Sequence, residues 1–260
     1  MSRAIAWLMW LMWLPLLAQA QAVAERAADP RRSGFEFMAP DTQALQRDDT
    51  LNPAMLWVKG GEQQWSARPR ADARSCADCH GAVERLRGVA ARYPAFDSAA
   101  QVPVTLGQRI NLCRQRHQQS APFEAESAPL LGLEALVGMQ SRQLPIAPPA
   151  DARLAPHVEQ GRQLYRQRLG QLDVSCAQCH DANAGGRLAG SLIPQAHPTG
   201  YPIYRLEWQG PGSLQRRLRN CMTGVRAEPF AYGAPELVAL ELYLMQRAAG
   251  LRIETPAVRP

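Results

Sequence analysis

The pentapeptide Cys-x-x-Cys-His occurs twice in this chain of 260 residues, at 76–80 and at 176–180. It is the attachment signature of a c-type haem, whose vinyl groups bond to the two thiols while the His becomes an axial ligand of the iron. A zinc site is the alternative, but zinc needs four ligands. The two strings therefore predict two covalently bound haem c groups. The expected attachment residues and iron ligands are Cys76, Cys79 and His80 in the first string, and Cys176, Cys179 and His180 in the second.

The first residues have the layout of a secretory signal peptide. Arg3 precedes an apolar run at 4–17, and two overlapping Ala-x-Ala patterns follow within 18–22. An uncleaved anchor is the alternative, but the run is shorter than the roughly 20 residues that a membrane span needs. We therefore expect residues 1–22 to be a cleaved signal peptide, and the mature protein to be periplasmic with no membrane span.

The formal charge of +6 gives no reason to expect a nucleic-acid partner. Cleavage of the signal peptide would remove Arg3, and two haems would add four propionates. The net charge would then be about +1, which is too small to indicate a polyanionic partner.

An internal repeat organises the chain. Before the haem strings the two halves correspond at an offset of 100 residues, with Gly61 and Trp65 matching Gly161 and Tyr165. After the strings the offset is 108, and the last matches slip by one residue. These later matches are Tyr93-Pro94 with Tyr201-Pro202, Arg109 with Arg217, Cys113 with Cys221, and Leu133-Glu134 with Leu240-Glu241. The repeat predicts two copies of one fold.

The fold class follows from the hydrophobic spacing. Helices are predicted at 129–143, 158–169 and 235–249, and no run alternates clearly enough to predict a sheet. The Pro-rich stretch 145–150 is the best linker. We therefore expect a mainly α protein of two tandem cytochrome c-like domains related by internal duplication, at 23–150 and 151–260, each with one haem.

The sixth position on each iron has several candidates. They are Met139, Met222, Met245, His117, His157 and His197. A ligand that serves both domains should recur in both, and Cys113 and Cys221 do so. A disulfide between these two is the alternative, but it would have to bring the Cα atoms of equivalent points in two domains within about 7 Å. Thiolate ligation by Cys113 and Cys221 is favoured, and it predicts haems of low reduction potential.

The surroundings of Cys221 suggest chemistry beyond ligation. Arg217 lies four residues earlier, so on a helix it shares a face with Cys221 and could hold the sulfur as thiolate. The Arg217 guanidinium could also bind an oxyanion such as a sulfonate through paired hydrogen bonds. Arg226 could add to this positive site unless Glu228 neutralises it. These arginines could instead pair with haem propionates. Arg109 also lies four residues before its cysteine, Cys113, so the spacing alone does not prove a substrate site.

With these residues the chain resembles the SoxA family, the cytochrome subunit of the SoxAX complex of bacterial thiosulfate oxidation, in its diheme form. The resemblance spans essentially the whole mature chain. The segments that carry it, besides the two haem strings, are 201–204, 217–221 and 225–229.

The resemblance implies an L-cysteine S-thiosulfotransferase, which joins thiosulfate oxidatively to a cysteine of the SoxYZ carrier protein while two electrons leave through haem to the SoxX cytochrome. It implies that Cys221 is carried as a persulfide and forms the covalent intermediate. It also implies that Arg217 binds the substrate anion, whereas Arg226 is a further candidate only from its position near Cys221. The first haem, with His80 and Cys113, is given no catalytic role.

Two other classes of function remain open at this point. A periplasmic diheme electron carrier would need no anion site beside a cysteine ligand. A diheme peroxidase would need an open or displaceable position on one iron.

Overall fold

The computed structural model describes residues 29–188 and 190–260, so the predicted signal peptide at 1–22 lies outside the described residues. Residues 32–260 form one compact unit. The α-helices are α2 Pro40–Arg47, α3 Met55–Ser66, α4 Cys76–His80, α5 Leu106–Gln118, α6 Ala128–Met139, α7 Ala155–Arg166, α8 Cys176–His180, α9 Leu214–Gly224 and α10 Pro235–Arg247. Short 3-10 helices are η1 Gly34–Phe37, η2 Val83–Leu86, η3 Ala90–Arg92 and η4 Ala152–Leu154.

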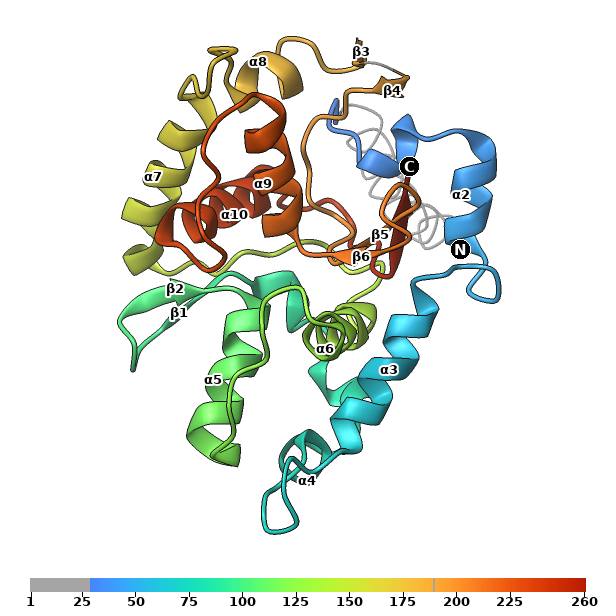
Figure 1. The fold of residues 1–260 in the computed structure, drawn as a ribbon, viewed down its shortest axis with the longest axis vertical. Coiled ribbons are helices and arrows are strands. Elements are labelled where there is room, and N and C mark those ends of the chain that lie inside the picture. Colours follow the sequence, from blue (N-terminus) through green and yellow to red (C-terminus); the bar gives the residue numbers. More distant parts are fainter. Residues whose placement is uncertain (1–28, 189) are drawn as a thin grey trace, which may run out of the picture. The chain divides into compact units, whose positions relative to one another are not determined.

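Two helix pairs are the framework of the fold, and they are equivalent in the repeat. Helix α3 packs on α6, and α7 packs on α10 (Figure 1). Each crossing is close because a glycine lies at it. A Cβ on Gly61 would collide with the carbonyl of Gly132, and a Cβ on Gly161 would collide with that of Ala239. The repeated glycines of the sequence therefore mark the points where two helix backbones meet.

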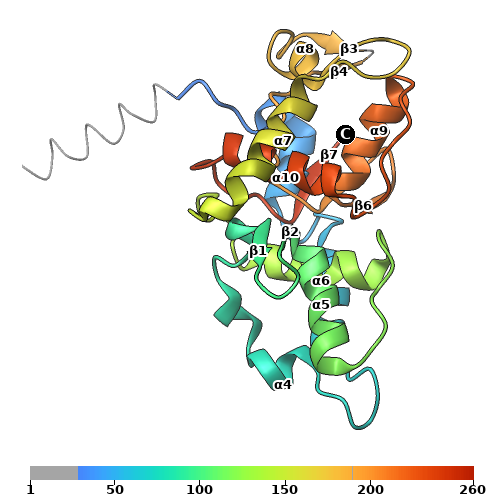
Figure 2. The same cartoon turned by 90° about the vertical axis from the view of Figure 1, so that its left-hand side faces the viewer.

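The expectation that no sheet forms is wrong in a limited sense, because short strands occur. The strands are β1 Ala95–Asp97, β2 Val102–Val104, β3 Arg187–Leu188, β4 Ser191–Leu192, β5 Ile203–Arg205, β6 Gly210–Gly212 and β7 Ala257–Arg259. Strands β1 and β2 form one antiparallel hairpin (Figure 2). Strands β5 and β6 form its counterpart, to which β7 adds in parallel. Two or three residues are too few to show the alternation by which a strand is recognised in sequence.

The three predicted helices are present as α6, α7 and α10; α10 begins at the predicted residue, and the other ends are displaced by one to four residues. The predicted linker at 145–150 is not a free tether, because Ile146 is 2% exposed and packs with Ala248 and Ile253. Its backbone N–H also donates to the carbonyl of Leu251. The domain boundary at 150 stays a prediction.

Each helix pair has its own hydrophobic cluster. The first includes Val58, Trp65, Leu133 and Leu136, and the second includes Tyr165, Leu214, Leu237, Leu240 and Leu244. Both clusters touch the first cysteine of a haem string, Cys76 or Cys176. Within the part of the chain that the structure describes, no helix has the length and hydropathy to cross a bilayer.

Candidate haem and thiol sites

Each haem string forms one short helix held by a capping box. The Ser75 side chain accepts from the Asp78 N–H at 3.0 Å, and the Asp78 carboxylate accepts from the Ser75 N–H at 2.8 Å. Ser175 and Gln178 repeat this arrangement at 3.2 and 2.8 Å. A capping box satisfies two N–H groups that a helix start leaves unpaired. These boxes fix α4 and α8 so that each string keeps its two thiols and its His on one turn.

A cavity of about 1080 Å³ opens beside the first string. Cys76, Cys79 and His80 line it, and Cys113 of α5 lines it as well. Its other walls include the apolar residues Trp65, Leu86, Val89, Leu106, Ile110, Phe123, Leu133 and Val137. Two thiols and an imidazole beside a large apolar cavity are the donor set and the surroundings that a covalently attached haem requires, and Cys113 offers a further sulfur. The residues present therefore fit a haem c.

The second string presents its histidine in the form that an iron ligand needs. His180 Nδ1 lies 2.6 Å from the carbonyl oxygen of Pro194, which can only accept a hydrogen bond. Nδ1 must therefore carry the proton, and Nε2 keeps its lone pair for a metal. Burial lowers the pKa of His180, which also favours the neutral ring.

All six cysteines lie within the described residues, and each is a free thiol. The alternative of a disulfide between Cys113 and Cys221 is therefore not found. Each of these two instead lies near its own haem string. Burial raises the pKa of Cys76, with a smaller contribution from Cys113, and burial raises the pKa of Cys176 to about 11, with a smaller contribution from Cys221.

The other candidate iron ligands fall in different places. Met222 is buried in the second hydrophobic cluster, and Met139 and Met245 pack against other core residues. His197 Nδ1 lies 2.8 Å from the carbonyl oxygen of Arg32, and His157 lies on α7. His117, one turn after Cys113 on α5, lines the first haem cavity and is the one competitor of Cys113 in that lining.

The two equivalent arginines differ in what neutralises them. Arg109 Nη1 lies 2.6 Å from Asp97 Oδ2, and the Asp97 side chain is 2% exposed. The Arg217 side chain is half-buried and has no ion pair with any described residue, although it lies one turn before Cys221 on α9. Arg226 is exposed in the loop after α9, and no ion pair joins it to Glu228 within the described residues. Arg217 thus keeps an uncompensated charge on the helix that carries Cys221.

Sequence reasoning did not assign Arg205 and Tyr201, which the tertiary structure brings to the same region. Burial raises the pKa of Tyr201 to about 12, and the charges of Arg217 and Cys221 both act on its phenol. Arg205, at the end of β5, is 13% exposed, and its pKa is lowered by burial and by the charge of Arg217. For Arg205 the sequence signal was the repeat, because position 205 matches position 97, and Tyr201 also begins the segment 201–204 that carries the family resemblance.

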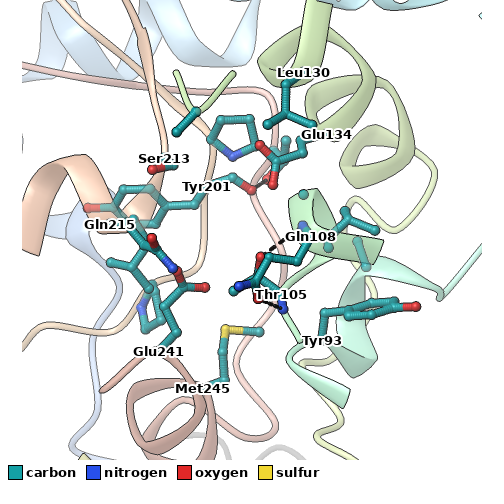
Figure 3. Close-up of a pocket in the computed structure, with 18 of the residues that line it drawn as sticks. Tyr93, Thr105, Gln108, Leu130, Glu134, Tyr201, Ser213, Gln215, Glu241 and Met245 are labelled. Carbon is teal, nitrogen blue, oxygen red and sulfur yellow. Dashed lines mark hydrogen bonds between the residues drawn. The ribbon is translucent and has the colours of Figure 1, made fainter. Parts of the chain in front are cut away.

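A second cavity, of about 270 Å³, lies where residues of both repeats meet (Figure 3). Glu134 and Glu241 line it from α6 and α10, and Glu126, Tyr93 and Tyr201 line it as well. Burial raises the pKa of Glu134 and that of Glu241 to about 8, and the charge of Glu126 acts in the same direction on both. The sequence shows these two glutamates only as matching positions of the repeat.

Comparisons with known proteins agree with this geometry. The family model for the SoxA/TsdA cytochrome c domain matches residues 60–146 and 160–253. The chain is 36% identical to the L-cysteine S-thiosulfotransferase subunit SoxA of Rhodovulum sulfidophilum over 89% of this chain and 81% of that one. It is 34% identical to the SoxA subunit of Paracoccus pantotrophus over 87% and 78%.

Among solved structures, the crystal structure of SoxXA from P. pantotrophus matches with a TM-score of 0.85 and 33% identity. The match covers 88% of this chain and 87% of that chain. A cytochrome c domain of this kind carries covalently bound haem c, in agreement with the two Cys-x-x-Cys-His helices and the apolar cavity beside α4. The fold, the haem strings and the similarity over most of its length together show that this chain belongs to the SoxA family of cytochromes c.

Proposed function

We propose that the protein is a haem-dependent S-thiosulfotransferase that acts with a SoxX cytochrome c subunit and uses the SoxYZ carrier protein as its sulfur acceptor. It carries two haem c groups in two tandem domains, with His80 and Cys113 on the first iron and His180 and Cys221 on the second. The names of its relatives support the activity, and the similarity to the crystal structure of SoxXA supports the partner. The protein works in the periplasm.

The reaction is an oxidative sulfur–sulfur bond formation. Thiosulfate and the thiolate of a carrier cysteine combine to a cysteine S-thiosulfonate, and two electrons are released. The carrier thiol gives its proton to solvent beforehand, when it ionises to the reacting thiolate. Bound haem supplies the acceptor through which these electrons leave for SoxX.

Cys221 is the covalent centre in this proposal. It is carried as a persulfide, whose outer sulfur is more acidic and more nucleophilic than a thiol. That sulfur joins the sulfane sulfur of thiosulfate as two electrons leave. The carrier thiolate then attacks the same sulfane sulfur, the bond to Cys221 breaks, and the Cys221 persulfide is restored.

Arg217 binds the sulfonate end of thiosulfate. The observation that carries the proposal is that Arg217 has no anionic partner among the described residues, whereas the equivalent Arg109 pairs with buried Asp97 at 2.6 Å. A half-buried guanidinium without a carboxylate is suited to an incoming oxyanion, which it can hold through two parallel hydrogen bonds. Arg226 is a further contributor from the loop after α9 once the substrate is bound.

The test is thiosulfate-dependent electron transfer by the haem-loaded complex with SoxX, in the presence of SoxYZ. We expect Arg217→Gln to lower kcat/KM by roughly 100-fold, because a charge-assisted bidentate contact to the reacting anion is lost. Arg216→Gln is the matched control on the same helix and should change it less than about twofold. Cys221→Ser should abolish turnover.

Peptide mass mapping of the segment that holds Cys221 gives an independent result. One extra sulfur on Cys221 in protein purified without reductant supports the transferase. An unmodified Cys221, together with full thiosulfate turnover in Arg217→Gln, would contradict it and favour a plain diheme electron carrier.

A further inference from the structure

Each repeat has a β-hairpin, and at one equivalent position of the two hairpins the side chains have opposite charges. In the first hairpin Asp97 of β1 pairs with Val102 of β2, and in the second Arg205 of β5 pairs with Gly210 of β6. Arg109 lies twelve positions after Asp97, and Arg217 lies twelve positions after Arg205. The structure therefore places Asp97 and Arg205 at equivalent points relative to the two equivalent arginines.

The helices that follow the hairpins keep this correspondence. The Thr105 hydroxyl caps α5 by accepting from the Gln108 N–H, and the Ser213 hydroxyl caps α9 by accepting from the Arg216 N–H. Each cap lies four residues before the arginine, so Arg109 and Arg217 occupy the same position in the first turn of their helices. The difference between the two sites is thus one of charge at position 97 or 205, not one of backbone.

In the first repeat the arginines are neutralised from within. The Asp97 carboxylate is 2.6 Å from Arg109 and 2.8 Å from Arg116, and hydrogen bonds from Arg116 and from the backbone hold its pKa well below its usual range. The residue that corresponds to Arg116 in the second repeat is Gly224. The first site is therefore closed to an external anion.

In the second repeat the carboxylate is replaced by another guanidinium. Arg205 is 13% exposed, and the glutamate that it contacts, Glu207 at 2.6 Å, is 61% exposed and so largely screened by solvent. Arg205 Nε is buried and has no hydrogen-bond partner among the described residues. A buried donor of this kind costs free energy unless an acceptor reaches it.

Stacking on an aromatic ring restrains the Arg205 side chain. Its guanidinium lies 5.2 Å from the ring centroid of Trp208, and Arg216 lies 4.1 Å from the same ring on α9. The charges of Arg217, Cys221, Arg259 and Arg205 all act on the phenol of Tyr201, so these groups lie in one region of the protein. A second positive charge, held by stacking on Trp208, therefore lies in the region of Arg217 and Cys221.

We propose that Arg205 is a second anion-binding residue that, with Arg217, makes a paired-guanidinium site selective for doubly charged oxyanions. The identity of that anion as thiosulfate rests on the proposed function. The chemistry needed is a divalent tetrahedral oxyanion, because two guanidiniums that pair with no buried carboxylate among the described residues offer two positive charges and several N–H donors. A haem propionate is the other source of an oxyanion, and the experiment separates the two.

The experiment uses the haem-loaded complex with SoxX and the variant Arg205→Gln. We expect the KM for thiosulfate to rise about tenfold with kcat changed less than twofold, because the lost charge acts on binding. Competitive inhibition by sulfate, a dianion, should weaken by a similar factor, while inhibition by nitrate, a monoanion, should change little. Arg216→Gln, which removes a cation from the other contact of Trp208, should leave all three values within about twofold.

Arg205→Lys tests whether charge alone is sufficient, and it stands in if Arg205→Gln does not fold. Lysine keeps the charge but cannot make the planar fork, so its KM should fall between those of the wild type and Arg205→Gln. An unchanged KM and unchanged sulfate inhibition, with a shifted haem midpoint potential, would assign Arg205 to a propionate and overturn the proposal.

Sulfate binding measured by calorimetry keeps the test independent of turnover. If the wild type binds sulfate and Arg205→Gln does not, the anion site stands even where thiosulfate turnover is absent. If sulfate binds both equally, the anion site fails, whatever the activity is.

Discussion

Gly61 of α3 lies directly against the backbone of Gly132 of α6, so closely that a Cβ on Gly61 would meet the Gly132 carbonyl. Its neighbour Gly60 is in the same helix with no atom within 4 Å of the position its Cβ would take. An added methyl group should therefore clash at Gly61 and be accommodated at Gly60. One allows two helices to meet, and the other has open space.

We expect Gly61→Ala to lower the free energy of unfolding by about 1–3 kcal/mol, because the added methyl group overpacks the crossing. Gly60→Ala should raise it by about 0.5–1 kcal/mol, since alanine favours the helix more than glycine does. Denaturant unfolding of the two haem-loaded variants, followed by circular dichroism, measures both. Equal effects of the two substitutions would show that the helix crossing does not limit the space at Gly61.

The paired glutamates of the smaller cavity predict a pH dependence of stability. The folded pKa of Glu134 and that of Glu241 are both about 8, above the usual 4.5. Between these values the folded protein keeps a proton that the unfolded chain has lost, so the free energy of unfolding should fall as pH rises from 4.5 to 8. The groups facing these carboxyls are Glu126, Gln215, Tyr93, Tyr201 and Tyr232.

The variants Glu134→Gln and Glu241→Gln should each flatten this fall, because an amide does not ionise. The measurement is the unfolding free energy at pH 5, 6, 7 and 8. The exposed Glu228→Gln is the control and should run parallel to the wild type. A Glu134→Gln variant that loses as much stability over this range as the wild type would contradict the assignment.

The buried ion pairs of Asp97 predict a pH dependence of stability with the opposite sign: stability should fall as the pH falls. Hydrogen bonds from Arg116 and the backbone hold the Asp97 pKa below its usual 3.8, so its stabilisation is present above pH 3.8 and is lost as pH falls below it. We expect Asp97→Asn to lower the melting temperature clearly at pH 7, and the gap to the wild type to narrow toward pH 3. Thermal unfolding at the two pH values measures it. Asp151→Asn, which breaks an ion pair with the 52% exposed Arg153, should cost much less at pH 7.

The axial ligand of the first haem can be identified by spectroscopy. Cys113 and His117 both line the cavity beside the first haem string, one turn apart on α5. Arg109 and Arg116 act against the rise that burial causes in the Cys113 pKa, which helps the thiolate form. We therefore expect Cys113→Ala to remove the electron paramagnetic signature of one thiolate-ligated haem, while His117→Ala leaves it. The reverse result would assign the ligand to His117.

Much of this protein was readable from its sequence because its most informative features are local. The two Cys-x-x-Cys-His strings each occupy one turn of helix, and Ser75 and Ser175 cap those turns within three residues. The repeated Gly61 and Gly161 predicted two equivalent packing units, and the structure shows equivalent helix crossings at both. Short-range chemistry of this kind needs no tertiary information.

The remaining features depend on contacts between distant segments. The roles of Asp97 and Arg205 cannot be predicted from the sequence. Each depends on the arginine twelve positions further along the chain, which the fold brings close to it in space. Likewise Glu134 and Glu241 share a cavity only because α6 and α10 carry them to it. The sequence by itself determined the cofactor chemistry, the repeat and the helices, since each is encoded within a few neighbouring residues. Only the tertiary structure decided which charges are neutralised, because burial and long-range proximity set the energy of an ion.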